Sequence, residues 1–170
     1  LFHEDVPTAY IRQVFATMER AHWHTFHVLT KRADRLVRLA PSLPWPKNIW
    51  LGVSVERHDY FWRIDRLRKV PASKRFLSVE PLLGPLPNLD LTGIDWVVLG
   101  GESGSNPRLL DGAWVRGIRD QCLHADVKFT FKQWGGKDRQ LNGRELDGRT
   151  WTDMPEPVRL SEQLALPLVG

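Results

Sequence analysis

The stretch VVLGGESG, residues 97–104, joins a short apolar run to a tip of glycine, glutamate and serine. A continuous apolar run of this length is typical of a strand buried inside a parallel sheet. In parallel α/β folds, the loops after the carboxyl ends of the strands form the ligand-binding face. This stretch therefore predicts a buried strand whose polar tip belongs to a ligand site.

On both sides of this stretch, apolar runs alternate with segments of helical periodicity. Residues 7–21 place apolar side chains on one helical stripe, and residues 112–125 do the same after the GGESG tip. Between residues 80 and 92, a Pro- and Leu-rich segment predicts an irregular connection instead of a helix. The expected strands are residues 25–30, 48–56, 74–80, 95–103 and 127–136, and the expected helices are residues 7–21, 31–40, 57–70 and 112–125.

This alternation predicts an α/β fold with a parallel sheet of about five strands, helices outside it, and both sheet faces buried. Because five strands cannot close an eight-stranded barrel, the sheet is either a partial (β/α) barrel or an open doubly wound sheet. We expect residues 1–134 to form this domain. Residues 135–170 form an irregular C-terminal extension that either completes the sheet edge or covers the rim.

Polar side chains recur where the expected strands end, and the carboxyl ends of parallel strands meet at one rim. Three glutamates, two lysines and several hydroxyls in that position are suited to a small zwitterionic or phosphorylated ligand. Each group also has a structural alternative: the glycines permit a turn with positive φ, and each glutamate caps a helix or pairs with an arginine. The candidate cofactor-binding residues are Lys31, Glu56, Ser78, Glu80, Gly100, Gly101, Glu102, Ser103 and Lys132.

Several other chemistries find little support in the sequence. Cys122 is the only cysteine among 170 residues and lies on a helical stripe, so we expect a buried thiol and a reducing, cytoplasmic location. The histidines of the segment 22–27 have no carboxylate nearby, so we name no metal site. No apolar stretch reaches membrane-spanning length, which predicts no membrane association. Trp134 and Trp151 lie in Gly- and Arg-rich surroundings that suit contact residues.

The charge balance permits a nucleic-acid partner. The formal net charge is +4 and the pI is about 9.5, which fits contact with phosphates but falls short of a basic tail. Arg63, Arg66 and Arg68 concentrate this charge on one expected helix. The charge therefore permits a nucleic-acid partner without implying one, and a non-catalytic nucleic-acid-binding module is an alternative to an enzyme.

Several blocks in order, among them HTFHVLTKRADRL, NIWLGVSVE, RFLSVEPLLGPL, IDWVVLGGESG and FKQWGG, resemble one protein family. This is an uncharacterised bacteriophage and prophage family of the gene-product thirty-seven/sixty-eight type, distantly similar to radical S-adenosylmethionine enzymes. The resemblance covers the chain from its start to about Pro155. It implies a partial barrel whose rim residues hold S-adenosylmethionine, with Glu102 and Ser103 among the contacts and Lys31, Glu56 and Glu80 nearby.

The family also carries an upstream segment with clustered cysteines that would bind an iron–sulfur cluster. Because such a cluster needs three thiolates and Cys122 is a single one, the resemblance implies a chain truncated before its cysteine cluster. For a complete family member it implies modification or repair of nucleic acid. A degenerate remnant of the family, with exposed sheet edges that promote association, is a further alternative.

Overall fold

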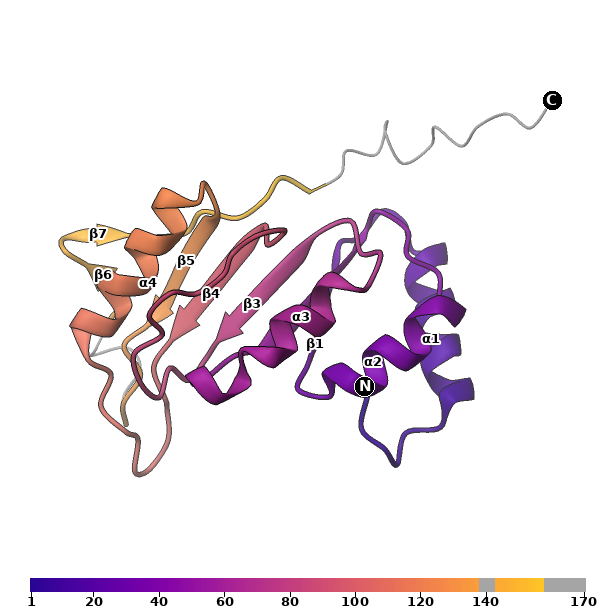
Figure 1. The fold of residues 1–170 in the computed structure, drawn as a ribbon, viewed down its shortest axis with the longest axis horizontal. Helices are drawn as coiled ribbons and strands as arrows, with labels where there is room; N and C mark the ends of the chain where they lie inside the picture. Colours follow the sequence, from indigo (N-terminus) through magenta and orange to yellow (C-terminus); the bar gives the residue numbers. More distant parts are fainter. Residues whose placement is uncertain (138–142, 158–170) are drawn as a thin grey trace.

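The computed structural model describes residues 1–137 and 143–157. Five parallel strands form one sheet in the order β1-β2-β3-β4-β5, so that neighbours in the chain are neighbours in the sheet (Figure 1). The strands are β1 (Phe26–Thr30), β2 (Ile49–Ser54), β3 (Arg75–Val79), β4 (Trp96–Gly100) and β5 (Lys128–Gln133). The predicted parallel α/β fold is confirmed.

One α-helix precedes the first strand, and three more connect strands of the sheet. They are α1 (Thr8–Arg20), α2 (Ala33–Leu39), α3 (Trp62–Arg68) and α4 (Gly112–His124), with short 3₁₀ turns at Ala40–Ser42 and His58–Tyr60. Helix α4 begins at Asp111, whose carboxylate accepts a 2.8 Å hydrogen bond from the backbone N–H of Ala113. The connection from β3 to β4 contains no helix, as the Pro-rich segment predicts. Among the described helices, none combines the length and apolar content that crossing a bilayer requires.

The helices α2, α3 and α4 all lie on one face of the sheet, and α1 packs beside α2 near the β1 edge (Figure 1). The main core lies between this face and the helices. It combines alternate strand residues, such as Leu51, Val53 and Leu77, with helix residues such as Ile64 and Leu67, and all five are at most 2% exposed. In a doubly wound sheet, the strand order reverses and helices cover both faces. Here the strands follow the order of the chain and helices cover one face, as in part of a (β/α) barrel.

The prediction that both sheet faces are buried is confirmed for the central strands β2 and β4, but helices bury only one of these faces. No described helix packs on the second face, which we call the open face (Figure 1). Its centre carries a separate cluster of Trp50, Phe76, Trp96 and Val98, whose large side chains bury one another. The strand sequences are apolar without interruption because bulky apolar residues occupy this face as well. Gly52 leaves room for the Phe76 side chain, since a Cβ at position 52 would lie 2.3 Å from the Phe76 ring.

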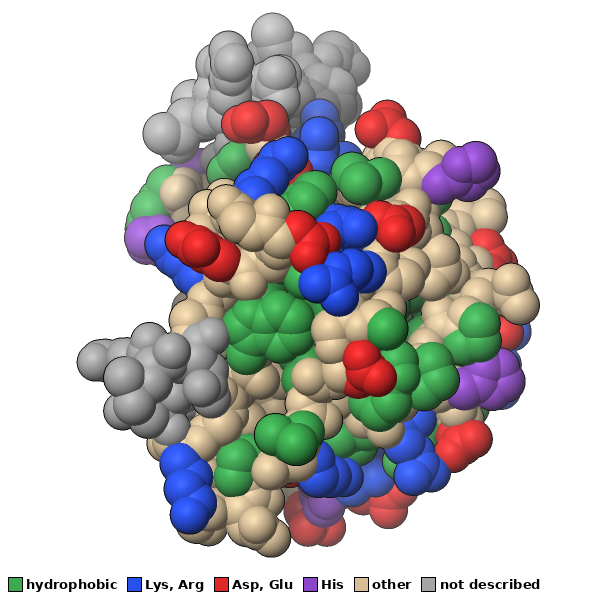
Figure 2. Space-filling view, turned by 90° about the vertical axis from the view of Figure 1, so that its left-hand side faces the viewer, with side chains coloured by type: hydrophobic (Ala, Val, Ile, Leu, Met, Phe, Trp, Pro, Cys, Tyr) green, Lys and Arg blue, Asp and Glu red, His purple; other side chains and the backbone are tan. Residues whose placement is uncertain are grey.

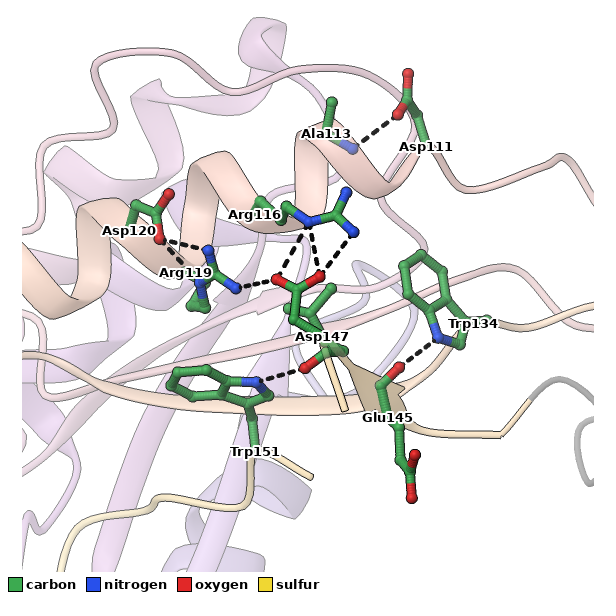
Figure 3. Close-up of polar contacts among 10 residues, drawn as sticks. Asp111, Ala113, Arg116, Arg119, Asp120, Trp134, Glu145, Asp147 and Trp151 are labelled. Carbon is green, nitrogen blue, oxygen red and sulfur yellow. Dashed lines mark hydrogen bonds and ion pairs between the residues drawn. The ribbon is translucent and has the colours of Figure 1, made fainter. Parts of the chain in front are cut away.

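The C-terminal extension completes one sheet edge. A hairpin of β6 (Glu145–Leu146) and β7 (Arg149–Thr150) packs on α4, where Arg116 and Arg119 both hold the carboxylate of Asp147 (Figure 3). The chain then runs along β5, and the carbonyl of Trp151 accepts a 2.9 Å hydrogen bond from the N–H of Phe131. Of the two roles open to residues 135–170, edge completion is the one adopted by the described part. Residues 138–142 and 158–170 lie outside the described residues.

Candidate functional site

The open face contains a hollow of about 420 Å³, here called the sheet hollow. This volume falls within the range of small-molecule sites. Successive strands contribute to it because side chains alternate between the two faces of a sheet, and alternate residues of each strand point away from the helices. The lining residues are His27, Leu29, Phe76, Ser78, Glu80, Trp96, Val98, Thr130 and Lys132.

An ion pair lies at the carboxyl-end side of the sheet hollow. Lys132 Nζ is 2.8 Å from Glu80 Oε2, and both side chains remain partly exposed, at 49% and 23%. Gly100 leaves the space that the Glu80 side chain occupies, since a Cβ there would lie 3.1 Å from Glu80 Oε1. The pair offers a ligand an anionic acceptor and a cationic donor side by side, so a zwitterion matches both charges.

Aromatic rings line the rest of the sheet hollow. The imidazole of His27 stacks on Trp50, with centroids 5.0 Å apart and planes inclined by 17°. Trp96 donates a 2.9 Å hydrogen bond from Nε1 to Thr130 Oγ1, and the ring of Phe76 lies against it, 5.6 Å between centroids. Burial lowers the pKa of His27 below its usual value of 6.5, which favours the neutral ring. These rings form an apolar floor suited to a flat heterocycle.

The structure brings four of the nine predicted residues together at this hollow. Ser78, Glu80 and Lys132 line it, and Gly100 makes room for Glu80. The remaining five lie in two other places at the same rim.

Lys31 and Glu56 lie beside the helices. The Glu56 carboxylate is only 4% exposed and is shared between Lys31 and Arg63, with Arg63 Nη1 at 3.1 Å from Oε2. Arg63 also donates a 2.8 Å hydrogen bond to the carbonyl of Ser54. This arrangement connects the ends of β1 and β2 to α3. Glu56 thus pairs with an arginine, which is the structural alternative to a ligand contact.

Gly101, Glu102 and Ser103 lie where two loops run side by side. The N–H of Gly136 donates a 2.7 Å hydrogen bond to the carbonyl of Glu102, and Gln133 Nε2 donates a 3.2 Å bond to Ser103 Oγ. A Cβ at Gly101 would lie 1.9 Å from the carbonyl oxygen of Trp134. The glycine is therefore required by close approach of two backbones. The alternative of positive φ is wrong for both Gly100 and Gly101.

The side chain of Glu102 is engaged by Arg108. The guanidinium makes two contacts, 2.7 and 2.8 Å long, with the two carboxylate oxygens, and the backbone N–H of Arg108 adds a third at 2.9 Å. These hydrogen bonds lower the pKa of Glu102 from 4.5 to about 2. A ligand at this loop would have to replace or extend the Arg108 contact.

Sequence reasoning missed the aromatic part of the site. Trp50 and Trp96 are buried, and they belong to the open face rather than the helix-covered core. The available signal was their position in the strands: Trp50, Phe76 and Trp96 alternate with smaller apolar residues that face the helices. Of the proposed contact tryptophans, Trp151 is 8% exposed and donates to the carbonyl of Leu146, so it serves the hairpin (Figure 3).

The thiol is buried as predicted. Cys122 is fully buried, and burial raises its pKa to about 12, so the thiol stays protonated. Among the described residues, no three side chains of His, Cys, Asp or Glu gather in a way that could hold a metal ion.

Comparison with known protein families matches residues 1–155 to the family described as "Protein of unknown function (DUF5131)". No curated protein and no solved structure matches the chain. The matched residues include all five strands of the sheet and the β6–β7 hairpin, so the sheet hollow lies wholly within them. This confirms that the sequence blocks belong to an uncharacterised family, without bearing on its origin or its relationship to radical enzymes: the chain belongs to the DUF5131 family of proteins of unknown function.

Proposed function

We propose that the sheet hollow binds a nucleoside with a zwitterionic side chain, of the S-adenosylmethionine class, and that the complete protein modifies or repairs nucleic acid. The observation that carries the proposal is the Glu80–Lys132 pair beside an aromatic floor in one hollow of about 420 Å³. We propose in addition that this protein is of phage origin and is distantly related to radical S-adenosylmethionine enzymes.

The chemistry of the hollow fits such a ligand. Glu80 would accept hydrogen bonds from an ammonium group, and Lys132 would pair with a carboxylate. Phe76 and Trp96 would stack against the base, while Ser78 offers a hydroxyl to the ribose. When bound, S-adenosylmethionine would supply a transferable methyl or adenosyl group.

An iron–sulfur cluster does not fit these residues. Cys122 is the only cysteine in the sequence, and it is enclosed in the core with its pKa raised to about 12. Three thiolates are needed to hold the cluster of a radical enzyme. Any such cluster would need cysteines from outside these 170 residues.

Titration calorimetry with S-adenosylmethionine tests the proposal. Replacing Glu80→Gln or Lys132→Met keeps most of the side-chain volume and removes one charge of the pair. We expect each to weaken binding by roughly ten- to hundredfold, because a charged hydrogen bond contributes about 1.5–3 kcal/mol. A loss of binding for Trp96→Ala would add support for the stacked base.

The matched control is Asp95→Asn. Asp95 forms a similar half-exposed ion pair with Lys74, also 2.8 Å long, but this pair lies outside the sheet hollow. Wild-type affinity is expected for this variant. Equal affinity of Glu80→Gln and wild-type protein would contradict the proposal, as would complete absence of binding by the wild-type chain.

A further inference from the structure

A second hollow of about 340 Å³ lies beside α2 and the start of α3, and we call it the basic hollow. It shares the carboxyl-end rim with the sheet hollow, since its residues follow directly on β1. Its charged lining consists of five cations and two carboxylates: Lys31, Arg32, Arg35, Arg38 and Arg63, with Glu4 and Asp34.

Most of these charges already have partners. Lys31 and Arg63 share Glu56, and Asp34 accepts a 2.7 Å hydrogen bond from Arg66. Arg35 donates to the carbonyls of the N-terminal segment, including that of Val6 at 2.5 Å. These pairings account for Glu56 and Asp34 but not for Glu4. Because five cations face two carboxylates in the lining, the surplus charge of the hollow is positive.

Two guanidinium groups carry that surplus. Within residues 1–137 and 143–157, the exposed side chains of Arg32 and Arg38 have no hydrogen-bond or ion-pair partner. They stand at the beginning and in the last turn of α2, six residues apart, which corresponds to about 9 Å along the helix axis. Arg63 adds a buried Nε without a partner among the described residues.

An exposed aromatic ring completes this hollow. Trp62, the first residue of α3, is 41% exposed, and the guanidinium carbon of Arg63 lies 5.7 Å from its ring centroid. A large aromatic side chain with this exposure, set among arginines, gives a base a surface to stack on. An exposed aromatic ring would not contribute to binding a phosphate alone, because its face stacks on a base.

We propose that the basic hollow binds single-stranded nucleic acid, with Arg32 and Arg38 contacting separate phosphates and Trp62 stacking on a base. Because six residues separate the two arginines along α2, each can contact a different phosphate of an extended strand. This inference rests on the proposed action on nucleic acid and names where the strand would bind, next to the proposed ligand site.

The α4 side of the molecule differs in its electrostatics. Figure 2 views that side and shows acidic and basic side chains alternating over the upper part of the surface. There Arg116 and Arg119 are neutralised by Asp147 and Asp120. Arginines occur on both sides, so what distinguishes the basic hollow is that two of them lack acidic partners.

Fluorescence anisotropy with a short labelled oligothymidylate, followed across a salt titration, tests the inference. The double variant Arg32→Gln/Arg38→Gln should bind about tenfold more weakly. It should also reduce the slope of log affinity against log salt by about 1.4, because each single-strand phosphate contact contributes about 0.7. Trp62→Ala should weaken binding about tenfold, and Trp62→Phe should restore most of it.

The matched control is Arg12→Gln/Lys69→Gln, which removes the same charge from exposed positions outside the basic hollow. An equal loss in this control would show unspecific attraction and overturn the inference. Wild-type affinity in Arg32→Gln/Arg38→Gln would overturn it too, even if Trp62→Ala folded poorly. Displacement of the oligonucleotide by inorganic phosphate at constant ionic strength would assign the hollow to a free phosphate ligand and also overturn it.

The two proposals fail separately. Glu80→Gln should not weaken oligonucleotide binding, and Arg32→Gln/Arg38→Gln should not weaken binding of S-adenosylmethionine. If the chain binds oligothymidylate as expected but no S-adenosylmethionine, the nucleoside ligand fails and the basic hollow stands. If S-adenosylmethionine binds and the arginine pair has no effect on oligothymidylate, the basic hollow fails alone.

Discussion

Glu56, Glu80 and Glu102 occupy similar places after three neighbouring strands, yet each carboxylate has a different role. Glu56 is enclosed and shared by two cations, whereas Glu102 is held by three hydrogen bonds from Arg108. Glu80 faces the sheet hollow with Lys132 and remains accessible. Exposure alone does not separate Glu80 from Glu102, since their side chains are 23% and 29% exposed. What distinguishes Glu80 is that it lines the sheet hollow.

The contact of Glu102 with Arg108 predicts a low titration midpoint. Arg108 lowers the pKa of Glu102 to about 2, so the folded state favours the ionised form. Stability from this pair is complete above the ordinary pKa of 4.5 and is lost as the pH falls through about 2. Carboxyl NMR should show a midpoint near 2 in the wild-type protein, and Arg108→Gln should move it up toward 4.5. A wild-type midpoint close to 4.5 would contradict the contact.

At the scale of elements, two loops are joined through their backbones. The loop after β4 and the loop after β5 exchange hydrogen bonds through Gly101, Glu102 and Gly136, which extends the pairing of the two strands. Such an approach is possible only where a side chain is missing. Glycine at position 101 thus has a structural reason that is independent of any ligand.

Replacing Gly101→Ala should destabilise the protein. The new Cβ would lie 1.9 Å from the carbonyl oxygen of Trp134, and a backbone atom cannot move aside as a side-chain end can. We expect a loss of about 1–3 kcal/mol in the free energy of unfolding, measured by urea denaturation. Gly84→Ala is the matched control, because nothing lies within 4 Å of its added Cβ. Equal stability of both variants would show that the loops do not approach so closely.

At the scale of the whole molecule, the two edges of the sheet differ. The chain around Trp151 covers the outer edge of β5, whereas β1 is the other edge strand of the five-stranded sheet. A groove between β1 and α1 is lined by Leu1, Tyr10 and Leu29, which are 38%, 55% and 43% exposed. An uncovered edge strand with apolar neighbours is a template for association with other strands.

Leu29→Lys should reduce self-association of this chain. A lysine on an edge strand opposes pairing with another strand because its charge would have to be desolvated. Light scattering coupled to size-exclusion chromatography, over a range of concentrations, should show a lower mean mass for this variant than for wild type. Leu109→Lys, at a loop position that is 94% exposed, should behave like wild type. Equal masses for all three proteins would contradict a role for the β1 edge.

Local sequence pattern determined much of this protein. Apolar runs and helical stripes located all five strands and four helices within a few residues, because the period of apolar side chains reflects which backbone geometry can bury them. The polar strand ends correctly indicated Ser78, Glu80 and Lys132 as neighbours, since parallel strands end at one rim. The single cysteine predicted a buried thiol.

Only the tertiary structure decided which face of the sheet stays open and which polar groups remain accessible. A strand of continuous apolar residues has the same pattern whether helices or large aromatic side chains bury its second face. The alternation therefore places Trp50 and Trp96 on one face but does not show that Trp96 lines a hollow there. Likewise, Arg108 and Arg63 engage Glu102 and Glu56 through contacts between side chains that the fold brings together. Periodicity is a local property, whereas accessibility is set by neighbours distant in the chain.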